Sequence, residues 1–152
     1  IDRKGFRYAI EAAKELNLEI TIAGPDNNKN FFDSNSDLLS YEKLNVIYGN
    51  PNEDSILDLY NSHTIFLHPS ILEAGHPNLT LLEAMACMLP TVGTYRGSVE
   101  IPGLRKIERD TNSVVSGIQY VVGNYDSSIE KISKSRPLTP CFNKSFMTHK
   151  ST

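Results

Sequence analysis

Two glutamates in the middle of the chain, Glu73 and Glu83, are the residues whose types and positions most readily suggest chemistry. Glu73 lies in the loop after an apolar run at 64–67, and Glu83 lies inside a helix that we expect to begin after Asn78. Carboxylates accept hydrogen bonds from sugar and ribose hydroxyls. The start of a helix offers free backbone N–H groups and the positive end of its dipole to a phosphate. These features suit a ligand with two hydroxyl-bearing rings and a phosphate between them, as in a nucleotide-sugar.

The spacing of the two glutamates also allows a purely structural interpretation. Leu81, Leu82 and Ala84 indicate that Glu83 lies close to the buried surface, where a carboxylate is costly without hydrogen-bond donors. Glu83 could therefore pair with a basic side chain, and Glu73 could be a solvated loop residue. The sequence has no GxGxxG motif and no Walker-type glycine loop, so a dinucleotide or nucleoside-triphosphate site has little support.

The elements that must position these side chains alternate between helical and strand periodicity. We expect helices at 6–13, 37–44, 53–61, 78–89 and 127–132, and strands at 18–22, 46–48, 64–67, 91–94 and 118–122. The Asn-, Asp- and Ser-rich segment 26–36 is typical of a loop. Strands separated by helices predict an α/β, Rossmann-like parallel sheet with helices on both faces. Ligands of such sheets bind beyond the carboxyl ends of the strands.

The composition limits the class of protein. The 152 residues suit one domain, and a net charge of −3 with scattered Lys and Arg argues against a nucleic-acid partner. No apolar run approaches the roughly 18–20 residues that span a bilayer, and no secretory signal is visible. Cys87 and Cys141 do not form a disulfide framework, and the histidines lack metal-ligand spacing, so we expect a cytoplasmic protein without a metal site.

Several motifs resemble the C-terminal, donor-binding domain of family 4 retaining glycosyltransferases, which is one half of a GT-B fold. The resemblance rests on 68–73 (HPSILE), 75–78 (GHPN) and 81–92 (LLEAMACMLPTV). The opening 3–6 (RKGF) is similar to that domain's first helix, 20–24 (ITIAG) to its second strand, 46–49 and 58–60 to its base-binding region, and 94–101 (TYRGSVEI) to a later loop. The resemblance covers residues 3–132.

The resemblance implies roles for the two glutamates and for the start of the helix. Glu73 would contact the transferred hexose and stabilise charge at its anomeric carbon, and Glu83 would bind the ribose hydroxyls. Backbone N–H groups near Asn78, Leu79 and Thr80 would hold the distal phosphate. The loop between Glu73 and Glu83 is longer than is usual in the family.

The remaining implied roles belong to residues outside this helix. Lys4 would neutralise the diphosphate leaving group, Tyr48 and Gly49 would line the base pocket, and Gly24 at a strand end would belong to the same donor site. Basic side chains and the helix dipole would stabilise the leaving group, so the resemblance implies neither a metal nor another cofactor. Met88 stands where the family commonly has glycine, and a left-handed turn there would cost about 1 kcal/mol.

We therefore expect a nucleotide-sugar-binding domain at 1–132 and a tail at 133–152. The chain begins at Ile1, and we expect a longer parent that supplies the family's preceding strand and its N-terminal acceptor domain. The parent would transfer a hexose from a donor such as a UDP- or GDP-hexose to a glycan, lipid or other acceptor, and the isolated domain would be inactive. Peripheral membrane association of the parent stays open. The alternatives are a non-catalytic nucleotide-sugar-binding or interaction module and, ranked lower, a nucleotide-sugar epimerase of the same fold.

Overall fold

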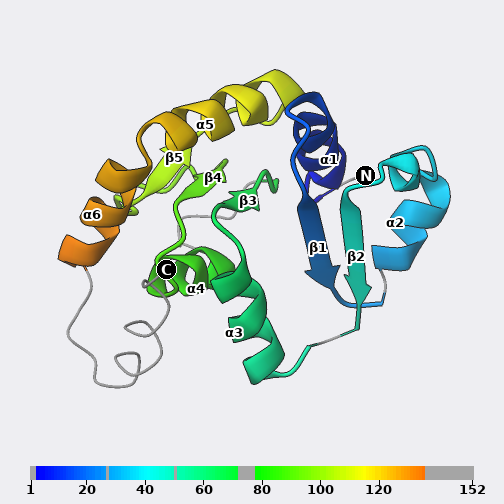
Figure 1. Cartoon of the computed structure of the whole chain (residues 1–152), viewed down its shortest axis with the longest axis horizontal. Helices are drawn as coiled ribbons and strands as arrows, with labels where there is room; N and C mark the ends of the chain where they lie inside the picture. The colour runs from blue at the N-terminus through cyan, green and yellow to red at the C-terminus, as the bar shows by residue number, and fades with distance from the viewer. Residues whose placement is uncertain (1–2, 27, 50, 72–77, 136–152) are drawn as a thin grey trace, which may run out of the picture.

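The computed structural model describes residues 3–26, 28–49, 51–71 and 78–135, and they form an α/β arrangement (Figure 1). The helices are α1 (Phe6–Glu15), α2 (Asn28–Ser34), α3 (Glu53–Ser62), α4 (Leu79–Ala86), α5 (Thr111–Gly123) and α6 (Tyr125–Ser135), with a short 3-10 helix, η1 (Leu38–Ser40). The strands are β1 (Ile20–Gly24), β2 (Leu44–Tyr48), β3 (Phe66–His68), β4 (Thr91–Gly93) and β5 (Leu104–Lys106). The predicted α/β class with parallel strands is confirmed.

The strands form two parallel sheets. β1 pairs with β2, with Ile20 opposite Leu44 and Gly24 opposite Tyr48. β4 lies between β3 and β5 in the other sheet. Within the described ranges no ladder joins the two sheets. They are linked instead by a 3.0 Å contact between His63 Nε2 and Thr21 Oγ1 and by Leu67, which packs against the apolar cluster around β1.

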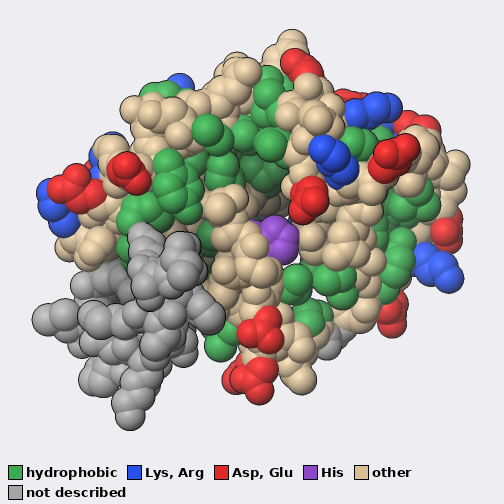
Figure 2. Space-filling model, viewed as in Figure 1, with side chains coloured by type: hydrophobic (Ala, Val, Ile, Leu, Met, Phe, Trp, Pro, Cys, Tyr) green, Lys and Arg blue, Asp and Glu red, His purple; other side chains and the backbone are tan. Residues whose placement is uncertain are grey.

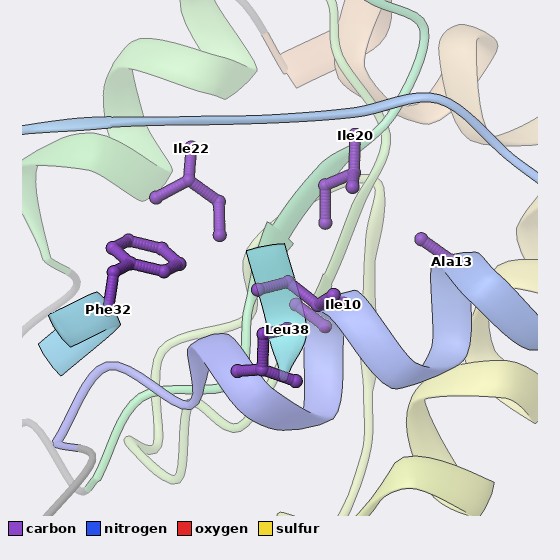
Figure 3. Close-up of a cluster of buried hydrophobic side chains, with 7 residues drawn as sticks. Ile10, Ala13, Ile20, Ile22, Phe32 and Leu38 are labelled. Atoms are coloured by element: carbon purple, nitrogen blue, oxygen red, sulfur yellow. The ribbon is translucent and has the colours of Figure 1, made fainter. Parts of the chain in front are cut away.

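That apolar cluster lies between α1, β1 and α2, and Figure 3 shows its buried side chains pointing toward one another. Ile10 from α1 and Phe32 from α2 are almost fully buried. Ile22 and Leu38 complete the same interior from β1 and η1. The ring of Phe32 lies 5.1 Å from that of Phe31 in an edge-on arrangement, which aromatic pairs favour. This packing fixes β1 and β2 against their covering helices.

A separate cluster packs α5 against β4. Val92 of β4 contacts the buried face of α5, which includes Val114 and Ile118. Ala12 of α1 is also fully buried in this cluster, although its neighbours Ile10 and Ala13 belong to the cluster around β1. α1 and α5 lie side by side at the top of Figure 1. Helix α1 therefore packs into both of these clusters and connects the two sheets.

The predicted strand at 118–122 is wrong, because this segment is part of α5. Its Val and Ile residues favour strand propensity, but the buried positions recur with helical spacing at Val114, Ile118 and Val121. Asp110 caps the helix start by accepting a 2.8 Å hydrogen bond from the N–H of Ser113. Tertiary packing on β4 thus overrides β propensity.

Other boundaries also differ from the prediction. The expected loop at 26–36 contains α2, which forms because Phe32 is buried against α1 and β1, and the expected helix at 37–44 is reduced to η1. β5 was not predicted, and the strand predicted at 64–67 is β3 at Phe66–His68. The predicted helices at 6–13, 53–61 and 127–132 are confirmed as α1, α3 and α6 with small shifts of their ends.

Candidate functional site

The turn that contains Lys4 is attached to the carboxyl end of β3. The carbonyl of Arg3 accepts hydrogen bonds from the N–H of Ile71 at 2.7 Å and from the hydroxyl of Ser70 at 3.3 Å. Gly5 is buried with φ +73°, and a Cβ at this position would lie 2.1 Å from the carbonyl oxygen of Pro69. Only glycine allows this approach. These contacts hold the turn at the strand end where ligands of parallel sheets bind, and Lys4 is exposed there.

The segment after β3 is further fixed by two other parts of the chain. The Thr94 hydroxyl donates to the Ser70 carbonyl at 2.5 Å, and the Thr94 N–H donates to the His68 carbonyl at 3.2 Å. Arg109 Nε donates to the Pro69 carbonyl at 3.2 Å. Ser70 is buried. The carboxyl end of β3 is therefore a preorganised platform for the turn that carries Lys4.

Asn78 caps the start of α4, as predicted. Its side-chain oxygen accepts hydrogen bonds from the N–H of Thr80 at 3.0 Å and from the Thr80 hydroxyl at 2.9 Å. The side chain of Leu79 is 68 % exposed. The start of α4 is thus accessible next to Leu79, while the N–H of Thr80, an expected phosphate donor, is engaged by the cap in this structure.

Glu83 lies one turn further along α4 and is partly buried, in agreement with its predicted closeness to the core. The hydroxyl of Tyr60, on α3, donates a 2.9 Å hydrogen bond to Glu83 Oε2. Burial, and next the hydrogen bond to Glu83, raise the pKa of the Tyr60 hydroxyl, which stays protonated and able to donate. Among the described residues, the hydrogen-bond partner of Glu83 is therefore a hydroxyl and not the basic side chain that the structural interpretation offered.

Three other expected site residues lie together at the end of the sheet that contains β1 and β2. Gly24 and Tyr48 are opposite each other in the last register pair, and Gly49 follows with φ +101°. Tyr48 is 41 % exposed, and its ring contacts that of Phe32 edge-on at 6.3 Å. The ring of Tyr48 and the turn at Gly49 are thus accessible to solvent at this strand end. The described contacts do not join this group to Lys4 or Glu83.

Glu73, the expected contact to the transferred hexose, lies outside the described residues, as does most of its loop. Its role stays a prediction. Met88 has φ +62°, the left-handed conformation that is costly for a residue other than glycine. The N–H of Leu89 donates to the Ala84 carbonyl at 2.9 Å and that of Met88 to the Met85 carbonyl at 3.0 Å, which closes α4 before Pro90.

A cavity of about 660 Å³ lies at the carboxyl ends of β4 and β5. Its lining includes Tyr95, Arg96, Arg105, Lys106, Ser113 and Ser116. Arg96 forms a 2.6 Å ion pair with Glu108, and Arg105 lies over the ring of Tyr120. The hydroxyl of Tyr95 is buried and has no hydrogen-bond partner among the described residues. The sequence did not indicate this cavity because β5, which forms one wall, was not predicted.

The described residues contain no group of three or more His, Cys, Asp or Glu side chains able to hold a metal ion. None of the helices in the described ranges is long and apolar enough to cross a membrane. On the face in Figure 2, acidic and basic side chains are interspersed around the molecule and are not gathered in one basic patch.

The sequence did not predict two contacts that support the candidate site, from Tyr60 to Glu83 and from Arg109 to Pro69. Tyr60 has helical spacing with Ile56 and Leu57 and lies in the segment 58–60 that is similar to the family's base-binding region, but neither feature predicted a contact with Glu83. Its contact with Glu83 joins residues 23 positions apart. Arg109 lies 40 positions from Pro69. Local spacing carries no signal for such pairs.

The fold is similar to that of several solved glycosyltransferases. The glycosyltransferase from Rickettsia africae ESF-5 superimposes with a TM-score of 0.69 at 18 % identity, over 88 % of this chain and 38 % of that protein. WaaG, a glycosyltransferase involved in lipopolysaccharide biosynthesis, gives a TM-score of 0.63 at 19 % identity, over 90 % of this chain and 40 % of that protein. The pneumococcal O-GlcNAc transferase GtfA, solved with UDP and GlcNAc, gives a TM-score of 0.51 at 18 % identity, over 88 % of this chain and 26 % of that protein.

The α/β fold is therefore that of a domain of GT-B glycosyltransferases. The family model described as "Glycosyl transferases group 1" matches residues 1–135, and the chain belongs to this family. No curated protein sequence matches the chain. The chain spans less than half the length of the solved structures to which it is similar.

Proposed function

We propose that this chain binds the nucleotide-diphosphate sugar donor of a retaining hexosyltransferase. The observation that carries the proposal is the arrangement around α4. Asn78 caps its start, and a partly buried Glu83 one turn later has its carboxylate held by Tyr60. A carboxylate at this place can accept hydrogen bonds from a ribose, and the adjacent helix start favours a phosphate.

The turn with Lys4 supplies a positive charge for the diphosphate. The Arg3 carbonyl and Gly5 fasten this turn to the end of β3, so the backbone from which the Lys4 side chain extends is held at that strand end. Preorganised charge stabilises a leaving group without the cost of reorganisation during the reaction. Glu73 would contact the transferred hexose, and Gly24, Tyr48 and Gly49 would line the base pocket.

Transfer to an acceptor would require a further domain. The solved relatives are more than twice as long as the part matched here. The isolated chain would therefore bind a donor without transferring its sugar. The acceptor class, whether glycan, lipid or protein, would be selected by the other domain.

Calorimetric titration of the chain with UDP, GDP, ADP and their sugars tests the proposal. UDP-sugars come first because the related GtfA was solved with UDP and GlcNAc. We expect selective binding of one diphosphate, at least tenfold weaker in Glu83→Ala, since a hydrogen bond to a charged group contributes about 1.5–3 kcal/mol. The matched control is Glu130→Ala, because Glu130 is an exposed residue of α6 that pairs with Lys134. Equal binding by both variants would sink the ribose role of Glu83.

Removal of metal ions should leave donor binding unchanged. Lys4 and the start of α4 would supply the positive potential for the diphosphate without a divalent cation. We expect the same affinity with EDTA and with added Mg²⁺ or Mn²⁺. A tenfold loss on chelation would contradict a metal-independent site.

A further inference from the structure

We infer that Tyr60 is a positioning residue for the donor site and acts only through the carboxylate of Glu83. The inference rests on the proposed function, because it assigns Tyr60 a role in the same ribose subsite. Tyr60 lies on α3 and Glu83 on α4, and their side chains meet at 2.9 Å between the Tyr60 hydroxyl and Glu83 Oε2. Tyr60 is therefore placed one side chain behind the group expected to contact the ribose.

The ring of Tyr60 is itself fixed by the sheet. It contacts the ring of Phe66 edge-on, with centroids 5.8 Å apart and an interplanar angle of 63°. Phe66 begins β3, the strand whose carboxyl end holds the turn with Lys4. The same short strand therefore positions both proposed contacts to the donor: Lys4 through the loop at its end, and Glu83 through Phe66 and Tyr60.

A glutamate side chain needs such support to bind a ribose with fixed geometry. Free glutamate samples several rotamers, and this freedom is lost when a ligand binds. The hydrogen bond from Tyr60 fixes Oε2 before the donor arrives, and Oε1, which accepts no hydrogen bond from the described part of the chain, can accept from a ribose hydroxyl. Preorganisation of this kind raises affinity by lowering the entropic cost of binding.

The chemistry also explains why a hydroxyl is the suitable support. A lysine or arginine partner would neutralise the carboxylate and weaken its attraction for ribose hydroxyls. A tyrosine hydroxyl restrains the carboxylate and leaves its charge in place, since it donates one neutral hydrogen bond. Glu83 can then bind the ribose as a full anion.

The experiment is a double-mutant cycle of nucleotide binding with Tyr60→Phe, Glu83→Ala and the double variant, measured by calorimetry with the preferred nucleoside diphosphate. We expect Tyr60→Phe to weaken binding about tenfold, the loss of one hydrogen bond to a charged group, and to have no further effect when Glu83 is already alanine. Tyr41→Phe is the matched control, because its hydroxyl donates to backbone carbonyls of Ala13 and Leu18 instead.

The outcomes separate the two proposals. Unchanged affinity in Tyr60→Phe, while Glu83→Ala binds at least tenfold more weakly, would overturn the positioning role and leave the donor site intact. An equal loss from Tyr60→Phe in both backgrounds would also overturn it, since Tyr60 would then act on the nucleotide independently of Glu83. Absence of nucleotide binding by the folded wild-type chain would overturn the donor site and with it the role of Tyr60. Far-UV circular dichroism and thermal unfolding of each variant establish that the fold is retained.

Discussion

At the scale of single residues, the site depends on close contacts that leave no room for substitution. Gly5 is the clearest case, because its backbone lies against the Pro69 carbonyl in a left-handed conformation. The sequence placed Lys4 and Gly5 in a motif, and the structure gives the motif a physical cause. The turn must pass directly over the end of β3, and any side chain at residue 5 would separate the two.

Gly5→Ala should therefore destabilise the protein and weaken donor binding together. The positive φ alone costs a non-glycine residue about 1 kcal/mol or more, and the Cβ must also displace Pro69. We expect a lower free energy of unfolding in urea and a weaker affinity for the diphosphate. The control is Gly123→Ala at the end of α5, where a Cβ meets nothing within 4 Å. A Gly5→Ala protein as stable as this control would contradict the interpretation.

The sequence predicted part of this site correctly. Asn78 as a helix cap and the closeness of Glu83 to the core both depend on local spacing along one helix. The support from Tyr60 could not be predicted, because it depends on how α3 and α4 pack. Glu73 stays a prediction.

At the scale of elements, the ends of helices are set by individual backbone and side-chain interactions. α4 ends at a non-glycine residue in the left-handed conformation, and α5 begins at a carboxylate cap. The sequence misassigned the α5 segment because its Val and Ile residues suit either a strand or a buried helix face. The contact with β4 that decides between them is absent from any local pattern.

The strain at Met88 can be measured by comparing two substitutions. Met88→Ala removes the side chain and keeps the unfavourable φ, whereas Met88→Gly removes both. We expect the glycine variant to be the more stable by about 1 kcal/mol in urea unfolding, the reverse of their order in a helix interior. If the alanine variant were the more stable, the left-handed turn would not be the native conformation.

The cap at Asp110 should make the stability of α5 depend on pH. Hydrogen bonds from the N–H and the hydroxyl of Ser113 lower the pKa of the Asp110 carboxyl below its usual 3.8. A lowered pKa in the folded state stabilises the protein above the ordinary pKa, and this contribution is lost as the pH falls through the folded value. We expect Asp110→Ala to lower the melting temperature at pH 7, and the difference from wild type to shrink below about pH 3.8. A difference that stays constant to pH 2 would exclude the charged cap.

At the scale of the whole molecule, α1 connects the two parts of the fold. Its residues enter two of the three apolar clusters among the described residues, and Glu11 accepts a 2.6 Å hydrogen bond from the Thr111 hydroxyl at the start of α5. The alternating pattern of the sequence predicted the parallel α/β class correctly. It could not predict that the strands divide into two sheets, because sheet order depends on contacts between distant segments.

Ala12→Leu tests this dependence. Ala12 is fully buried where α1 meets α5, and added methyl groups in a close-packed interior cost about 1–3 kcal/mol. We expect the free energy of unfolding in urea to fall by this amount and amide exchange to become faster in both sheets, because α1 packs into the clusters of both. Glu15→Leu on the exposed side of the same helix should change stability by less than about 0.5 kcal/mol. Exchange that accelerates in one sheet alone would show that α1 serves only that sheet.

The division into two sheets has a consequence for how the chain can be cut. The segment between β2 and α3 is the covalent connection between the part that contains α1, β1 and β2 and the part that contains β3, β4 and β5. The noncovalent contacts across this boundary include the packing of α1 on α5, the Arg3 carbonyl with Ile71, and His63 with Thr21. Two separately expressed fragments, one ending just before Pro51 and the other beginning at Pro51, should associate through these contacts. A donor that bound as proposed would promote this reassembly, and the domain would then serve as a split reporter.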